Sequence, residues 1–315
     1  MVHSQKRFNP LLLPLKYFQL IGGGDDLLPT AEDYETLIDD GHKPRLLLGH
    51  YSKEMVLERL EQLDVLPKLR ERGFVDLIVN IDVSNSIRDE VQIFDKATKD
   101  DHLIAEIRFH IGNFVSESRY AGRLRGKTSK MLYIQWLLLQ NPFTNFTPQR
   151  PALPGQKYPG LKMGKEIMNL IIALGKRLHV DGVINVPEFP HAAVLYSRKF
   201  NFLNPTSQAI LKAFQRDMVG RTLAEGSWGI TIGCVRDLDT ERPKRWFQEE
   251  QVLPISKRWK NHFAHEKYIN KVREGLLKHH FVFDNEKWTR LFPLNPDGSP
   301  KETVDWGDRN TLSDE

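Results

Sequence analysis

The segment between residues 132 and 187 most constrains the fold of this chain. An apolar run, LYIQWLLLQNP, is followed by a proline-rich loop, a helical stretch, KMGKEIMNLIIALGKRLHV, and a second apolar run, VINVP. The two apolar runs are typical of buried strands, and the stretch between them has one apolar face at helical spacing. A strand, a crossover helix and a second strand imply two parallel neighbours with a cleft at the strand ends. We therefore predict an α/β fold with a mixed, partly parallel central sheet.

The flanking segments extend this order. Residues 75–83 favour a strand, and residues 89–95 and 102–111 favour a hairpin because two β-branched runs flank the polar turn KATKDD. Residues 191–200 favour a helix after VINVP. The predicted order is thus β, β-hairpin, β, long loop, α, β, α. The strand at 132–142 is expected to be covered on both faces.

The two ends of the chain are assigned by periodicity and composition. An N-terminal helix is predicted to begin after the N-cap Ser52, to break or kink at Pro67 and to stop at Gly73. Residues 226–235 favour one more strand, and residues 254–280 favour helix in one or two pieces. We expect a mainly helical N-terminal segment, an α/β core and an α+β C-terminal extension, with the boundaries 1–74, 75–212 and 213–315.

Composition limits the class of protein and the compartment. The chain has 315 residues, of which 40% are hydrophobic and 27% charged, so it is expected to fold around a sizeable core. The single cysteine, Cys234, cannot form an intramolecular disulfide, which favours a reducing compartment, the cytoplasm. Pro10, Pro14 and Lys16 interrupt the N-terminal apolar run, so we expect neither a signal peptide nor a membrane span. The net charge of +4 does not argue for nucleic acid as a partner.

The succession of elements resembles the GNAT N-acetyltransferase superfamily over residues 75–205. The segments that carry the resemblance are LYIQWLLLQNP, YPGLKMGKEIM, VINVP and HAAVLYSRKFNF. It implies that the strand before the helix splays from the next parallel strand, and that the pantetheine arm of an acyl-CoA lies in the gap on free backbone groups, here at Leu138 and Leu139. Acetyl-CoA or another acyl-CoA is then the cosubstrate of an N-acyltransferase. The acceptor is an unidentified amine, on a small molecule or a protein, which attacks the thioester directly.

The segment YPGLKMGK is similar to the loop R/Q-x-x-G-x-G/A that holds the pyrophosphate of CoA in that family. Unpaired amides and the positive end of a helix dipole suit a phosphate. The alignment places Gly164 at the last small position, Gly160 at an early glycine, Pro159 where Arg or Gln is usual, and Lys162 where the central glycine is usual. The cofactor-binding residues implied by this loop are Gly160, Leu161, Lys162, Met163, Gly164 and Lys165. An ordinary helix start is the alternative interpretation.

The segment AAVLYSRKFNF is similar to the family pattern A-x-x-L-Y-x-x-x-G-F, whose tyrosine protonates the departing CoA thiolate. A phenol with a pKa of about 10 keeps its proton at neutral pH and can donate it to a sulfur. Alignment from Ala192 assigns this role to Tyr196, whereas alignment from Phe202 assigns it to Ser197. A core aromatic residue is the structural alternative for Tyr196.

An attacking ammonium must first lose a proton, so a base is also required. The predicted order places the carboxylates of Glu106 and Glu188 nearest the cleft, with His191 as the alternative base. A solvent-facing position for Glu106 and a turn-supporting position for Glu188 or His191 are the structural alternatives.

Two other functions fit the same elements. A relative that takes its acyl group from an acyl carrier protein, as N-acyl amino acid and acyl-homoserine lactone synthases do, would suit the altered loop and the basic segment from Arg119 to Lys130. A GNAT-like module that binds a ligand or protein without catalysis is the third possibility. GGGDD near the N-terminus follows no strand and precedes no clear helix, so a turn is expected there. His279, His280 and Asp284 are not expected to form a catalytic or metal site, because the side chains of neighbouring histidines point in different directions.

Overall fold

The protein is described by a computed structural model over residues 45–116 and 119–302, together with the strand β1, Phe18–Gln19. The N-terminal apolar run and the GGGDD segment lie outside these residues.

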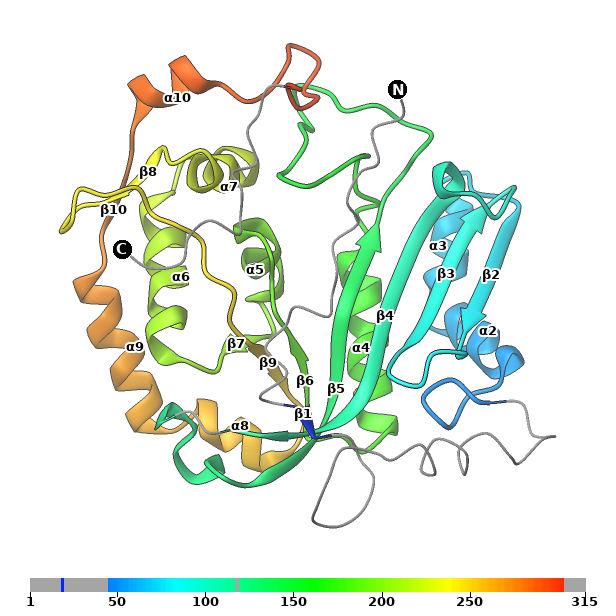
Figure 1. The fold of residues 1–315 in the computed structure, drawn as a ribbon. Coiled ribbons are helices and arrows are strands. Elements are labelled where there is room, and N and C mark those ends of the chain that lie inside the picture. Colours follow the sequence, from blue (N-terminus) through cyan, green and yellow to red (C-terminus); the bar gives the residue numbers. More distant parts are fainter. Residues whose placement is uncertain (1–17, 20–44, 117–118, 303–315) are drawn as a thin grey trace, which may run out of the picture.

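A mixed sheet forms the centre of the molecule (Figure 1). Its strands lie in the order β2, β3, β4, β5, β6, β9, β7, and β1 pairs with β4 beside this path. β5 and β6 are parallel, and the other described pairs are antiparallel. The prediction of an α/β fold with a mixed, partly parallel sheet is therefore confirmed. The strands on the path are β2 Leu77–Asp82, β3 Asp89–Asp95, β4 Leu103–Val115, β5 Thr128–Leu139, β6 Gly182–Asn185, β9 Gln251–Pro254 and β7 Asn201–Phe202.

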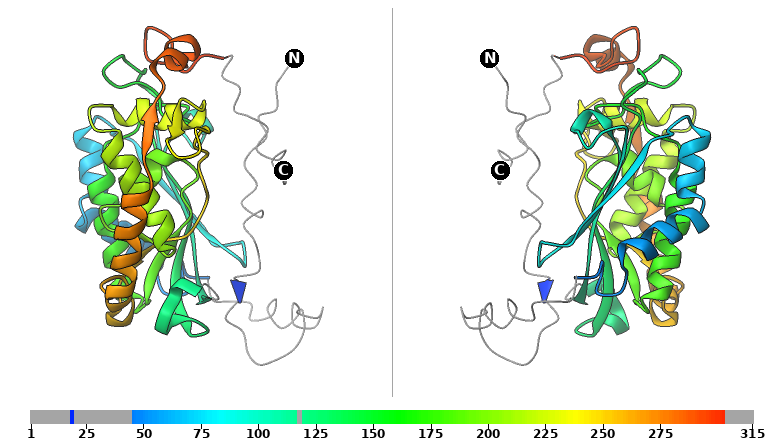
Figure 2. Two further views of the ribbon diagram at one scale, coloured as in Figure 1. Left: turned by 90° about the vertical axis from the view of Figure 1, so that its left-hand side faces the viewer. Right: turned by 90° about the vertical axis from the view of Figure 1, so that its right-hand side faces the viewer.

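Three helices cover one face of the sheet on the β2 to β5 side (Figure 2). Their apolar residues pack on side chains of the strands beneath and form one continuous core, in which Leu69, Ile93, Phe109 and Ile171 are buried. The helices are α2 Lys53–Gln62, α3 Val65–Glu71 and α4 Gly164–Arg177. Short 3₁₀ turns precede and follow β4, at Asp100–His102 (η3) and Arg119–Leu124 (η4).

The N-terminal helix begins where the sequence predicts but breaks elsewhere. The Ser52 hydroxyl accepts a hydrogen bond from the Met55 amide and caps α2. The prediction of a break at Pro67 is wrong, because the chain turns at Asp64, which has a left-handed φ of 62°. Pro67 lies in the first turn of α3, where its missing N–H group is not needed for an intrahelical bond.

The predicted hairpin and the strand–helix–strand unit are present. β3 pairs with β4 on either side of KATKDD, and β5 leads through the loop at 141–159 to α4 and then to β6. The prediction that β5 is covered on both faces is wrong for its second half. Residues 135–139 are half-buried because they line a cleft.

The C-terminal third adds helices beside β6 and β7 and a strand, β9, between them (Figure 1). Residues 254–280 form two helices, as predicted. The predicted strand at 226–235 is wrong, because its first half belongs to helix α7, which Thr222 and Glu225 start with a capping box. The elements not yet given are α5 Pro190–Tyr196, α6 Pro205–Asp217, α7 Leu223–Thr231, β8 Val235–Asp237, α8 Lys257–Phe263, α9 Glu266–Lys278, β10 Phe281–Phe283 and α10 Asn285–Leu291.

Candidate functional site

The parallel strands β5 and β6 form a fork. They pair from Met131 with Gly182 to Ile134 with Asn185. β6 ends at Asn185, whereas β5 continues to Leu139 with β4 as its partner on the other edge. A bulge in the pairing of β4 with β5 coincides with the point where the fork opens. Beyond Ile134 this edge of β5 therefore has no strand partner among the described residues until Gln140, which forms a bridge with Gly160.

The closed end of the fork is held by charge and close packing. The Arg258 Nη2 atom donates to Asp181 Oδ2 at 2.6 Å and to the Thr128 carbonyl at 2.7 Å. The Asp181 carboxylate also accepts a hydrogen bond from the Lys130 amide. Gly182 allows β6 to approach β5 and β9 closely, because a Cβ atom there would lie 3.2 Å from the Met131 sulfur of β5 and 3.0 Å from the Leu253 carbonyl oxygen of β9. The starts of β5 and β6 are thus fixed relative to each other, and only their ends diverge.

A cleft of about 1110 Å³ occupies the open end of the fork. Its walls come from the second half of β5, the first half of α4, the chain from the end of β6 into α5, and the loop at 153–158. Clefts of this size beside a strand end are typical of ligand sites. The gap between the two predicted strands is therefore open.

Backbone groups of β5 face this cleft. The Gln140 N–H group donates to the Ile104 carbonyl at 2.9 Å, which directs it toward β4. Because alternate residues of an antiparallel pair direct their N–H and C=O groups to the same edge, Leu138 also bonds toward β4, while Leu137 and Leu139 direct theirs to the open edge. Of the two predicted residues, Leu139 contributes backbone to the cleft and Leu138 contributes a side chain.

The predicted phosphate loop lies at the start of α4, and only part of it reaches the cleft. Gly164, the first residue of α4, lines the cleft, and no atom lies within 4 Å of a Cβ built there. No side chain caps this helix end, so its first amides point out of the helix without an intrahelical partner. The predicted loop residues that do not line the cleft are Gly160, Leu161, Lys162, Met163 and Lys165.

Contacts behind the loop fix its shape. Gly160 forms a bridge with Gln140, and the Arg72 Nε atom donates to the Leu161 carbonyl at 3.1 Å. Lys162 is exposed and has a left-handed φ of 56°, a conformation that glycine adopts more easily. At the position where the family pattern has its central glycine, the backbone therefore has the left-handed conformation that glycine favours, although the residue is a lysine.

Tyr196, the last residue of α5, lines the cleft and packs against Phe200 at a centroid distance of 5.4 Å. Burial raises the pKa of Tyr196 to about 12, so the phenol keeps its proton at neutral pH. Ser197 is not among the cleft residues, and its hydroxyl donates to the Val194 carbonyl at 2.7 Å. Of the two residues between which the sequence left the choice open, only Tyr196 reaches the cleft.

Charges of both signs line the cleft. Lys157 lies in the loop that leads to the uncapped start of α4. Glu188 follows β6, Glu249 and Glu250 precede β9, and Asp100 comes from η3. The start of α4 with Lys157 thus suits an anionic group, and the carboxylates suit a cationic one.

The other predicted bases occupy different positions. Glu106 is not among the cleft residues, and its side chain accepts hydrogen bonds from Gln92 and from Arg108, at 2.9 and 2.8 Å. Burial raises the pKa of this carboxyl, but hydrogen bonds from Glu90 and Gln92 and the Arg108 charge outweigh burial and leave the pKa of Glu106 below its ordinary value. Glu106 is thus placed as a member of an ion-pair network, whereas Glu188 lines the cleft.

His191 lines the cleft and is held by its neighbours. Its Nδ1 atom lies 3.0 Å from the Ser227 hydroxyl, and its ring stacks on Phe189 at 5.4 Å. Burial lowers the pKa of His191 to about 4, so the imidazole is neutral at neutral pH.

Unpaired polar atoms in the cleft were not predicted. Asn185 is 5% exposed, and neither its Oδ1 nor its Nδ2 atom has a hydrogen-bond partner among the described residues. The Gln135 Oε1 and Trp136 Nε1 atoms are also buried and also lack a hydrogen-bond partner among the described residues. All three residues line the cleft, at and beyond the point where the fork opens. Buried polar groups are nearly always paired, so these atoms indicate a site for water or a ligand. The asparagine within the otherwise apolar VINVP was the available signal.

The remaining sequence patterns have structural partners. The Arg216 guanidinium donates to the His279 carbonyl and lies 3.1 Å from His280 Nδ1, and the Asp284 carboxylate caps α10. In the described part of the chain no group of three or more His, Cys, Asp or Glu side chains is placed to hold a metal ion. None of the described helices has the length and apolar character needed to cross a membrane. Comparison of the chain with protein-family models and with curated protein sequences finds no match.

His110, beside the cleft, makes stability depend on pH. Its ring is 7% exposed and stacks on Tyr133 at 4.6 Å, and burial lowers its pKa from 6.5 to about 4. The unfolded chain therefore binds this proton below pH 6.5 while the folded chain does not, and stability falls between pH 6.5 and 4. We expect His110→Phe to remove about 2 kcal/mol of the loss in free energy of unfolding between pH 7 and 5, measured by urea denaturation. An unchanged pH dependence would show that His110 is not buried in its neutral form.

Proposed function

We propose that the protein is an acyl-CoA-dependent N-acyltransferase of the GNAT type. The observation that carries the proposal is the fork: β5 keeps a free edge beyond Ile134, and the cleft at that edge reaches the uncapped start of α4 at Gly164. A thioester arm can bond along such an edge while its pyrophosphate lies at the helix start.

The side chains around the cleft supply the remaining chemistry. An amine enters on the side of Glu188, Glu249 and Glu250, where carboxylates attract an ammonium, and Glu188 takes its proton directly or through water. The free amine attacks the thioester carbonyl, the carbon–sulfur bond breaks, and the Tyr196 phenol gives its proton to the departing thiolate. In this proposal the backbone N–H of Leu139, which points away from β4, polarises the carbonyl. Glu106 takes no part in this proposed reaction.

Binding of acetyl-CoA tests the proposal. Ligand at about 100 times its Kd stabilises a folded protein by about 2.7 kcal/mol, so acetyl-CoA is expected to raise the Tm by several degrees. CoA is expected to act similarly, and pantetheine, which lacks the phosphates, much more weakly. No rise with acetyl-CoA or with longer acyl-CoAs would contradict the proposal.

Lys162 offers a charge test of the same loop. Alanine at position 162 has a Cβ atom in the same left-handed backbone conformation as the lysine, so Lys162→Ala removes only the cation. We expect the affinity for acetyl-CoA to fall about threefold to tenfold. The loss of affinity should be smaller in high salt, which screens the charge. Lys176→Ala, at the exposed far end of α4, serves as the matched control. Equal affinities of the two variants in calorimetric titrations would place Lys162 outside the phosphate site.

One observation supports an acyl carrier protein as an alternative donor. Tyr120 of η4 lines the cleft, and Arg123, Arg125 and Lys127, which follow it in the chain, are exposed. An acidic carrier would meet this surface. If an acyl carrier protein supports turnover where acyl-CoA does not, and Arg123→Glu with Arg125→Glu abolishes it, the carrier is the donor.

A further inference from the structure

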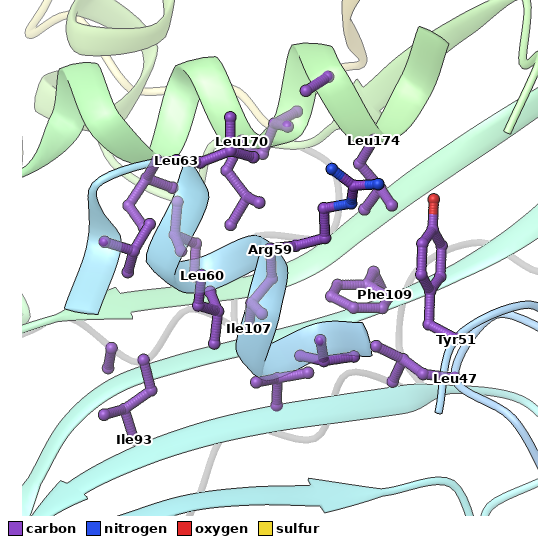
Figure 3. Close-up of a pocket in the computed structure, with 18 of the residues that line it drawn as sticks. Leu47, Tyr51, Arg59, Leu60, Leu63, Ile93, Ile107, Phe109, Leu170 and Leu174 are labelled. Atoms are coloured by element: carbon purple, nitrogen blue, oxygen red, sulfur yellow. The ribbon is translucent and has the colours of Figure 1, made fainter. Parts of the chain in front are cut away.

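A second, apolar pocket of about 320 Å³ lies between α2, α4 and the face of β3 to β5 (Figure 3). Aliphatic and aromatic side chains form almost all of its lining. Leu137, Leu139, Ile167 and Ile171 line this pocket and also the cleft, so they form a wall between the two. Ile167 and Ile171, the two members of this wall that come from α4, are buried. An unfilled apolar pocket of this size in a folded core is typical of a site for an apolar ligand.

Polar groups gather at one end of the pocket. Figure 3 shows Arg59 and Tyr51 on the same side as Leu174, while Ile93 lies at the opposite end. Arg177 also lines the pocket and lies one helical turn after Leu174 on α4. The pocket therefore has an apolar interior and a polar end, the arrangement that an amphiphile requires.

The charge at the polar end is positive. Arg59 and Arg177 come from different helices, are exposed, and form no ion pair with a described residue. Glu106 also borders the pocket, but its carboxylate bonds to Gln92 and Arg108 on the other face of the sheet. Nothing in the lining opposes the attraction of the two guanidinium groups for an anion.

We propose that this pocket binds a single-chain amphiphile of the fatty-acid class, with its alkyl chain toward Ile93 and its carboxylate at Arg59 and Arg177. Chain length and head-group charge then contribute separately to affinity. Each methylene that leaves water adds about fourfold, and the two exposed arginines together add about tenfold for a carboxylate. The proposal does not depend on the chemistry in the cleft.

Calorimetric titration of the full chain with dodecanoate tests the proposal. We expect one saturable site, with weaker binding of octanoate and about tenfold weaker binding of dodecanol, which has the same chain and no charge. Arg59→Gln combined with Arg177→Gln is expected to weaken dodecanoate about tenfold and to leave dodecanol unchanged. Lys53→Gln combined with Lys176→Gln, exposed on the same helices and outside the pocket, is the control and should change neither.

A variant that fills the pocket shows whether the amphiphile binds there or elsewhere on the protein. Ala173 lines the pocket from α4, and Ala173→Phe is expected to abolish binding of both dodecanoate and dodecanol. If that variant does not fold, Ala105→Val, which narrows the pocket from β4, should weaken both. Equal affinity for dodecanoate and dodecanol, or no saturable binding of either, would overturn the proposal. Binding of dodecanoyl-CoA that Ala173→Phe weakens, without any binding of dodecanoate, would also overturn it, because the chain would then enter from the cleft.

Discussion

Tyr196→Phe is expected to lower kcat by about 10² to 10⁴ while the KM for acyl-CoA changes little. The phenol lines the cleft at the end of α5, and its pKa of about 12 keeps it protonated over the usual assay range. Phenylalanine keeps the ring and its packing against Phe200 but has no proton to give to the sulfur. The rate is measured as acetyl-CoA-dependent thiol release with a panel of primary amines, using the amine that gives the highest turnover.

Tyr268→Phe is the matched control for this variant. The Tyr268 hydroxyl is buried and donates to the Phe202 carbonyl at 2.6 Å, away from the cleft. Its loss is expected to lower stability by about 1 kcal/mol or more and to leave kcat unchanged. If Tyr196→Phe retains the wild-type kcat, the proton must come from another group and Tyr196 has no role in the mechanism.

Trp259→Ala is expected to reduce the free energy of unfolding by about 3 to 5 kcal/mol. Trp259 on α8 is 0% exposed and packs against Phe114 in the core beneath the start of β5. Its Nε1 atom donates to the Ser129 hydroxyl at 3.1 Å, and Ser129 also accepts from Arg258. The tryptophan therefore ties α8 to the closed end of the fork.

A conservative variant separates packing from hydrogen bonding at this position. Trp259→Phe keeps an aromatic ring but leaves Ser129 without the indole donor, and we expect a smaller loss of about 1 to 3 kcal/mol. Both values come from urea denaturation at one pH. A loss below about 1 kcal/mol for Trp259→Ala would mean that α8 does not pack on β5 as described.

The central part of the fold was predictable because the secondary structure that residue type and spacing favour there is the one that packs into the core. The β-branched runs of β3 and β4 alternate on either side of a polar turn, and the apolar face of α4 has helical spacing. In α7 residue type and packing disagree. Residues such as Trp228 and Ile230 favour a strand by type, but the helix is buried and the capping box at Thr222 fixes its start. The start of α6 was missed, although Asn204 followed by Pro205 is a typical helix signal.

The candidate site was predictable only where it follows the order of the elements. The gap between β5 and β6, Gly164 and Tyr196 follow from that order and from the resemblance it supports. The orientation of Glu106 depends on strand register, because side chains alternate between the faces of a sheet, whereas Glu188 lies in the connection after β6, where no periodic pattern applies. The apolar pocket joins α2 to α4 across a long stretch of sequence, so no local pattern indicates it.

The most direct measurement is amide hydrogen exchange along β5 with and without acetyl-CoA. Leu137 and Leu139 direct their N–H groups to the free edge of the strand, whereas Leu138 bonds toward β4. If acetyl-CoA lies along this edge, amide exchange at Leu139 and at Leu137 slows on binding. Amide exchange at Leu138 stays unchanged. Saturating acetyl-CoA that leaves exchange at Leu139 as it is in the free protein would contradict the assignment of the fork as the acyl-CoA site.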